Sequence, residues 1–279
     1  MNTLRPFVIQ LNDDGTYHLN VQPDGTALTR LAASAVVFWA RKAIERRGRF
    51  HIALSGGSTP RTLFELLATA EFARQILWER VHVWWGDERD VPPDHADSNF
   101  RMANEALLRH VPLPAENVHR VRTELGAEAA AADYEHEILA AFEMQPGAGG
   151  WPVFDLLLLG MGDDGHTASL FSGSAALEPG ERLVLANRVE KLHTTRITFT
   201  APLINAADTV IFLVAGAGKA PMLRRVLLGE YDAVALPSQS IMPAGKLFWM
   251  TDAAAAAQVA EGPAYTQGEF IYRRMGEGE

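Results

Sequence analysis

The stretch Phe50-His51-Ile52-Ala53-Leu54-Ser55-Gly56-Gly57-Ser58-Thr59-Pro60 decides the fold. Its first five residues form an apolar run of the length expected for a buried strand. Two glycines then permit a tight turn, and Pro60 suits the first turn of a following helix because it has no N–H to leave unpaired. Backbone N–H groups at such a turn, backed by the positive end of the helix dipole, can hold an anion. The segment is also consistent with a plain strand-to-helix turn that binds nothing.

The same alternation of strand and helix recurs along the chain. Besides residues 50–54, apolar runs predict strands at 81–85, 154–159, 183–187, 197–200, 210–214 and 247–250. Amphipathic segments predict helices at 26–47, from Pro60 onward, and at 99–109, 127–143, 202–206, 219–228 and 253–260. Several of these strands are apolar at nearly every position, as in parallel strands that helices cover on both faces. We therefore predict a three-layer α/β/α fold with a mostly parallel, doubly wound sheet of the Rossmann type, in a single domain over residues 1–279.

Composition narrows the functional classes. The 279 residues include 25 basic and 34 acidic ones, for a formal net charge of −9, which argues against a nucleic-acid-binding surface. There is no cysteine, so disulfides, thiolate nucleophiles and cysteine-based zinc sites are excluded. The amino terminus lacks the apolar stretch of a signal peptide, and no apolar run is long enough to cross a bilayer. We expect a cytoplasmic protein with neither nucleic acid nor membrane as a partner.

A second glycine-bearing segment carries a titratable side chain. Gly160-Met161-Gly162-Asp163-Asp164-Gly165-His166-Thr167-Ala168-Ser169 follows the most apolar of the predicted strands. An imidazole that titrates near neutral pH suits general-base catalysis, and we expect His166 to have that role, oriented by Asp164. Other histidines, such as His18 and His110, lack this setting, and we expect them on the surface.

Three cations follow or precede predicted strands. Arg89 lies in Gly86-Asp87-Glu88-Arg89-Asp90-Val91-Pro92, where it can hold a phosphate or carboxylate or stabilise an oxyanion, unless the charges only fix a loop. Arg196 immediately precedes the strand predicted at 197–200. Lys219 follows a glycine turn at the start of a helix, where it either meets an anion or is an ordinary exposed lysine.

Taken in order, these motifs resemble those of the 6-phosphogluconolactonases, in the glucosamine-6-phosphate isomerase/6-phosphogluconolactonase family. The motifs that carry the resemblance are Ser-Gly-Gly-Ser-Thr-Pro at 55–60, Gly-Asp-Glu-Arg-x-Val-Pro at 86–92 with Asp-Ser-Asn at 97–99, Gly-Met-Gly-x-Asp-Gly-His-Thr-Ala-Ser-Leu-Phe at 160–171, Arg-Ile-Thr at 196–198, Gly-Ala-Gly-Lys at 216–219 and Trp-Met-Thr-Asp at 249–252. The resemblance extends over residues 25–255. Three features depart from it: Ser172 replaces a usual proline, residues 193–195 lack the usual prolines, and Asp90 adds an acid.

The resemblance implies hydrolysis of 6-phosphoglucono-1,5-lactone to 6-phosphogluconate in the pentose phosphate pathway, with no cofactor and no catalytic metal. It implies His166 as the base, with Asp164 and Arg89 as further catalytic residues. The implied substrate- and phosphate-binding residues are Ser55, Gly56, Gly57, Ser58, Thr59, Asp87, Gly162, Arg196 and Lys219. The expected partner is a small sugar-phosphate lactone, and the expected assembly is a monomer or weak homodimer.

Two other functions are open. A glucosamine-6-phosphate deaminase or sugar-phosphate isomerase shares the fold, but needs further carboxylates for ring opening and proton shuttling. The sequence after His166, Thr167–Ser172, offers no carboxylate, which favours the lactonase. A non-catalytic sugar-phosphate sensor would need a DNA-binding module, yet only the residues before 26 precede the first predicted helix, and the net charge is negative.

Overall fold

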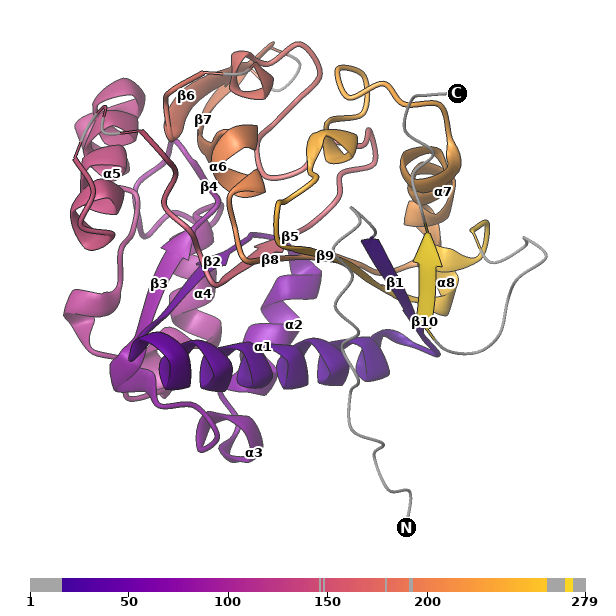
Figure 1. The fold of residues 1–279 in the computed structure, drawn as a ribbon, viewed down its shortest axis with the longest axis horizontal. Coiled ribbons are helices and arrows are strands. Elements are labelled where there is room, and N and C mark those ends of the chain that lie inside the picture. The colour runs from indigo at the N-terminus through magenta and orange to yellow at the C-terminus, as the bar shows by residue number, and fades with distance from the viewer. Residues whose placement is uncertain are drawn as a thin grey trace.

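A seven-stranded sheet runs through the centre of the molecule (Figure 1). The computed structural model describes residues 17–259, apart from 146, 148, 179, 191 and 192, together with a strand at 269–272. In spatial order the strands are β10 (Glu269–Tyr272), β1 (Tyr17–Gln22), β9 (Lys246–Asp252), β8 (Thr209–Val214), β5 (Leu156–Leu159), β2 (Phe50–Leu54) and β3 (Val81–Trp85). β10 pairs antiparallel with β1, and all other neighbours are parallel. The predicted mostly parallel sheet is confirmed.

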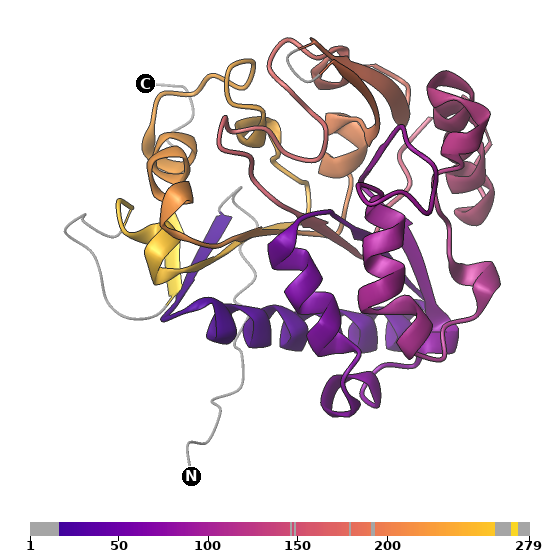
Figure 2. The same cartoon turned by 180° about the vertical axis from the view of Figure 1, so that it is seen from behind.

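Each face of the sheet has its own helix layer and its own apolar core (Figures 1 and 2). One layer contains α1 (Gly25–Arg47), α2 (Ser58–Leu67), α3 (Ala70–Ala73) and α4 (Asn99–Ala106). The other contains α5 (Ala127–Ala141), α6 (Ala201–Asn205), α7 (Ala220–Leu228) and α8 (Ala253–Ala256). Successive strand residues face opposite cores, so Phe212 stacks on Trp249 at 3.9 Å in one core whereas Ile211 belongs to the other. This is the predicted three-layer fold.

Helix ends follow local signals in the sequence. The side chain of Asp24 accepts the N–H of Ala27 at the start of α1, and Gly48 ends that helix in the left-handed conformation at φ 74°. At α4, Ser98 accepts the N–H of Arg101. The helix predicted at 99–109 stops at Ala106 and is followed by a 3₁₀ turn, Leu108–His110. The helix predicted at 253–260 is shorter, and position 260 lies outside the described residues.

Two of the predicted strands do not join the parallel sheet, which corrects that part of the prediction. They are β6 (Val184–Val189) and β7 (Thr194–Phe199), which form an antiparallel sheet with β4 (Asp87–Arg89) in the order β4-β7-β6. This small sheet is joined to the large one at Gly86, whose N–H donates to the Leu54 carbonyl and whose carbonyl accepts the Phe199 N–H. It therefore adjoins the carboxyl end of β2. An apolar run indicates a strand but does not identify its partner.

The order of the strands creates a crevice between β2 and β5. The chain runs from β2 to β3 on one side, then returns to β5 on the other side of β2. Connections that leave in opposite directions open a gap at the carboxyl ends of the two strands, which is where sheets of this class bind ligands. The segments that follow β2 and β5 are the two glycine-bearing segments singled out in the sequence.

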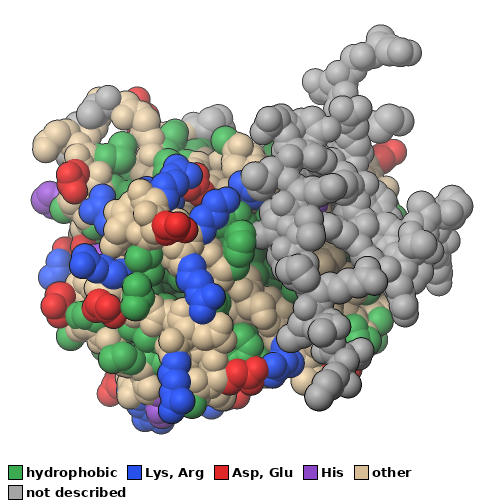
Figure 3. Space-filling view, turned by 60° about the horizontal axis from the view of Figure 1, so that its bottom comes forward, with side chains coloured by type: hydrophobic (Ala, Val, Ile, Leu, Met, Phe, Trp, Pro, Cys, Tyr) green, Lys and Arg blue, Asp and Glu red, His purple; other side chains and the backbone are tan. Residues whose placement is uncertain are grey.

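Charged side chains of both signs are interspersed on the face that carries α1 (Figure 3). Ion pairs of this helix layer include Arg30 with Glu71, at an N–O distance of 2.5 Å, and Arg61 with Glu65, at 3.1 Å. In the part of the chain that is described, no helix is long and apolar enough to cross a membrane.

Candidate active site

A cavity of about 160 Å³ lies among the segments that follow β2, β3 and β5. Its lining residues are Ser55, Gly56, Gly57, Asp87, Arg89, Asn99, Gly160, Met161, Gly162, His166, Thr167 and Ala168. Seven of these, Ser55, Gly56, Gly57, Asp87, Arg89, Gly162 and His166, were expected from the sequence to be site residues. The topology therefore brings together motifs that lie far apart in the chain.

The turn after β2 forms one wall of the cavity. Gly57 stands at φ 108° before the first turn of α2, and among the described residues no side chain caps that turn. The Ser55 hydroxyl is buried and has no hydrogen-bond partner in the described structure. Uncapped N–H groups beside an unpaired buried hydroxyl are suited to an anionic ligand. Ser58 and Thr59 begin α2 and do not line the cavity.

His166 is held from two sides. Its Nδ1 contacts the Asp164 carboxylate, and its ring stacks on Phe171 at 4.2 Å between centroids. The turn closes through the Gly162 N–H, which donates to the His166 carbonyl at 2.8 Å, and through Gly165 at φ 81°. Because an ionised carboxylate only accepts hydrogen bonds, the proton of the neutral ring sits on Nδ1, and Nε2 keeps its lone pair.

The surroundings of His166 keep its ring neutral. Burial is the main cause that lowers its pKa below the usual value. The positive charges of Lys219 and Arg196 lower the pKa further. The carboxylates Asp87 and Asp163 act in the opposite direction, but the net shift is downward. A neutral imidazole with a free lone pair at neutral pH is the form that a general base requires.

Asp87 is bound into the wall of the cavity. Its carboxylate accepts the Ser169 hydroxyl at 2.7 Å, and its backbone carbonyl accepts the Asn99 side-chain amide at 2.9 Å. Ser169 in turn receives the Asn187 amide on its carbonyl at 2.7 Å, which ties the wall to β6. These bonds fix Asp87 close enough to His166 to influence its pKa.

The three predicted cations surround the cavity unevenly. Arg89 lines it and donates to the Asp97 carbonyl, and Arg196 faces Arg89 across the β4–β7 ladder. Burial and the charge of Arg89 lower the pKa of Arg196. Lys219, in the 3₁₀ turn Ala217–Lys219 before α7, does not line the cavity and pairs with Asp163 instead. Two guanidinium groups on facing residues repel each other unless an anion lies between them.

The sequence also matches the model of a known protein family. The model described as glucosamine-6-phosphate isomerases/6-phosphogluconolactonase matches residues 23–249, a range that contains every residue of the cavity. The chain belongs to this family.

Members of the family with known sequences and structures are closely similar to this chain. A 6-phosphogluconolactonase of Nostoc sp. is 46% identical over 243 residues, covering 87% of this chain and 98% of that protein. One from Synechocystis sp. is 48% identical over 213 residues, covering 76% and 85%. Among solved structures, 6-phosphogluconolactonase from Trypanosoma cruzi superposes with a TM-score of 0.78 at 29% identity, covering 88% and 98%. A monomeric glucosamine-6-phosphate deaminase, at 16% identity and a TM-score of 0.70, shares the fold.

Two residues of this family member were not singled out as site residues from the sequence. Asn99 lines the cavity and lies so close to Gly56 that a Cβ there would be 1.9 Å from its Oδ1. Glu88 is buried and accepts the N–H groups of Asn99 and Phe100 at the start of α4. Burial raises the pKa of Glu88. Only the fold shows that the start of α4, which Ser98 caps, adjoins the cavity.

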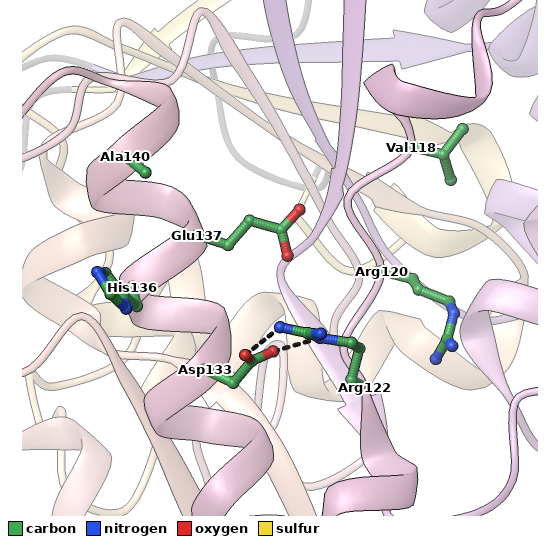
Figure 4. Close-up of a pocket in the computed structure, with 7 residues that line it drawn as sticks. All are labelled: Val118, Arg120, Arg122, Asp133, His136, Glu137 and Ala140. Carbon is green, nitrogen blue, oxygen red and sulfur yellow. Dashed lines mark hydrogen bonds and ion pairs between the residues drawn. The ribbon is translucent and has the colours of Figure 1, made fainter.

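A larger cavity of about 530 Å³ lies beside α5 (Figure 4). It is lined by Val118, Arg120, Arg122, Asp133, His136, Glu137 and Ala140, none of which belongs to the motifs that characterise the family. Its two arginines already have partners, because Arg122 pairs with Asp133 and Arg120 with Glu124. We therefore place the candidate active site in the smaller cavity. In the described ranges, no group of three or more histidine and acidic side chains is placed to hold a metal ion.

Proposed function

We propose that this chain hydrolyses 6-phosphoglucono-1,5-lactone to 6-phosphogluconate, with His166 as the general base. The observation that carries the proposal is the His166 ring, which lines the cavity with its Nδ1 held by Asp164. The same cavity contains the uncapped turn after β2 and the Arg89 guanidinium. The 6-phosphogluconolactonases among its relatives and structural neighbours support the choice of substrate.

The reaction needs no covalent nucleophile because a lactone is an activated ester. A water molecule attacks the carbonyl carbon and gives a proton to Nε2 of His166. The tetrahedral intermediate then collapses, the bond to the ring oxygen breaks, and the imidazolium returns the proton to that oxygen. Asp164 stabilises the imidazolium and holds the ring in position. Water supplies both the hydroxyl of the new acid and the hydrogen of the new alcohol, so the atoms balance.

Arg89 is the preferred donor to the developing oxyanion. The N–H groups of Gly162 and Gly165 are already bonded to carbonyls within the turn. The guanidinium has five N–H groups, so its bond to the Asp97 carbonyl leaves others for the substrate. We accordingly propose Arg89 rather than these two turn amides.

The phosphate is proposed to lie between the turn at Ser55–Thr59 and the cations Arg196 and Lys219. Ser55 offers its unpaired hydroxyl, and the first turn of α2 offers its N–H groups. An anion in this place also relieves the repulsion between Arg89 and Arg196. Binding a group remote from the carbonyl fixes the sugar ring against His166 and lowers the barrier by orientation.

The test is the rate of lactone loss, with lactone generated in situ by glucose-6-phosphate dehydrogenase and compared with spontaneous hydrolysis. We expect acceleration by the wild type and a loss of about 10²–10⁴-fold in His166→Asn, with binding of 6-phosphogluconate retained. Activity that survives in His166→Asn would remove His166 as the base. Folded wild-type protein that gives no acceleration would refute the lactonase assignment, and glucosamine 6-phosphate would be the next substrate to test.

We further propose that the enzyme works in the cytoplasm as a monomer or weak homodimer. All the residues that line the candidate active site belong to one chain. Sedimentation over a range of protein concentrations, with activity measured in parallel, tests the assembly. An assembly larger than a dimer, or a dimer that does not dissociate on dilution, would contradict it.

A further inference from the structure

Asp163 and Lys219 form an ion pair at the edge of the candidate site. The Lys219 Nζ lies 2.5 Å from Asp163 Oδ1. The side chain of Lys219 is 29% exposed and that of Asp163 is 85% exposed. Asp163 stands between Gly162, which lines the cavity, and Asp164, which holds His166. The hydrogen bond and charge of Lys219 lower the pKa of Asp163, so its carboxylate is ionised at neutral pH.

We propose that Asp163 competes with the substrate phosphate for Lys219 and thereby sets the affinity of the site. The inference rests on the proposed function, in which Lys219 is a phosphate ligand. In the free enzyme the ammonium binds the carboxylate. When a sugar phosphate enters, the phosphate takes over Lys219, and the Asp163 side chain turns to solvent.

The geometry permits this exchange. In the described structure, Lys219 is the only side chain with which Asp163 bonds, so its carboxylate can leave without breaking another contact. A pair this exposed is weak, because water screens the charges and two mobile side chains must be held. The ammonium of lysine is a point charge that accepts either anion in many orientations. Arg196, by contrast, forms no ion pair in the described structure, although the charges of Asp87, Asp97 and Glu88 act to raise its pKa.

The deciding experiment measures KM for the lactone and Kd for inorganic phosphate and 6-phosphogluconate in Asp163→Asn. We expect the KM and both Kd values to fall about two- to five-fold at low salt, because the ion pair that competes for Lys219 is lost. The difference should shrink as ionic strength rises. The matched control is Asp133→Asn, which breaks an ion pair between an aspartate and a different cation, Arg122, outside the candidate site (Figure 4). We expect wild-type constants there.

A double-mutant cycle with Lys219→Gln separates competition from simple repulsion. If Asp163 acts through Lys219, then Asp163→Asn should have no effect on KM or Kd in the Lys219→Gln background. A gain in affinity that persists there would overturn the inference, since a nearby negative charge repels phosphate whatever its partner. Unchanged or weaker binding by Asp163→Asn alone would also overturn it.

Direct binding keeps this inference distinct from the proposed function. Suppose that the wild-type protein binds phosphate and the double-mutant cycle gives the expected result, but the protein does not hydrolyse the lactone. That combination would refute the proposed function alone. Wild-type protein that binds neither inorganic phosphate nor 6-phosphogluconate would refute the competition as well.

Discussion

The carboxylate of Asp164 contacts Nδ1 of His166, two residues further along the chain. The same carboxylate accepts the backbone N–H of His166 at 3.2 Å. Nearness in sequence becomes contact because Gly165 takes a positive φ and the Gly162 N–H closes the turn on the His166 carbonyl. The acid, the turn and the imidazole therefore form one preorganised unit.

Replacing Asp164 by asparagine should lower kcat by between about ten-fold and 10⁴-fold. The asparagine oxygen can still accept the backbone N–H of His166, so the turn should survive. The side-chain amide can instead donate to Nδ1, which favours the tautomer with its proton on Nε2 and removes the lone pair that takes the proton from water. Steady-state kinetics, with circular dichroism as the check on folding, measures this. A kcat equal to that of the wild type would show that Asp164 does not orient the base.

Gly162→Ala should remove most of the activity while the protein stays folded. A Cβ at this position would lie 2.0 Å from Nδ1 of His166 and 2.8 Å from Oδ1 of Asp164, so the imidazole must move. A displacement of about 1 Å in a catalytic group can cost about 10²-fold in rate. Gly25→Ala is the control, because nothing lies within 4 Å of its added Cβ. Comparable kcat values in the two variants would contradict the placement of the ring.

Arg196→Gln should weaken substrate binding and slightly stabilise the free protein. Loss of a charged hydrogen-bond donor to phosphate should raise KM by about ten-fold or more. Removing the charge opposite Arg89 should raise the free energy of unfolding by roughly 0.2–1 kcal/mol in phosphate-free buffer. Kinetics and urea titration measure the two effects. An unchanged KM would exclude Arg196 from the phosphate site.

The protein should lose stability as the pH falls below 6.5, because the buried His51 and the half-buried His82 must stay neutral. Burial lowers the pKa of His51 to about 3 and that of His82 to about 4. Trp84 also donates to Nδ1 of His51 at 3.1 Å, a bond that only an unprotonated nitrogen can accept. The unfolded chain binds more protons in this range, so each histidine adds a slope of up to about 1.4 kcal/mol per pH unit.

Urea titrations between pH 7.5 and 4 should reveal that slope. The variant His51→Gln, which can still accept the Trp84 N–H, should show a shallower decline. His110→Gln, at an exposed position, should follow the wild type. Equal slopes in wild type and His51→Gln would mean that His51 is not responsible for the acid sensitivity.

The sequence by itself determined what depends on neighbours along the chain. β2 and β3 have the predicted bounds because a mostly apolar run of this length needs only burial on both faces to become a strand. α1 ends at Gly48 because only a residue tolerant of positive φ fits there. The motif residues after β2, β3 and β5 meet because parallel strands align their carboxyl ends at one edge.

Only the tertiary structure decided which distant segments pair. β7 lies beside β4, so Arg196 faces Arg89, and the start of α4 adjoins the turn after β2, so Asn99 enters the site. His18, expected on the surface, is buried and stacks on Phe248 at 5.0 Å. The type of a residue and the periodicity of its neighbours along the chain do not identify these tertiary partners. They follow from packing two cores against one sheet, in which contacts between segments far apart in the chain decide what each side chain meets.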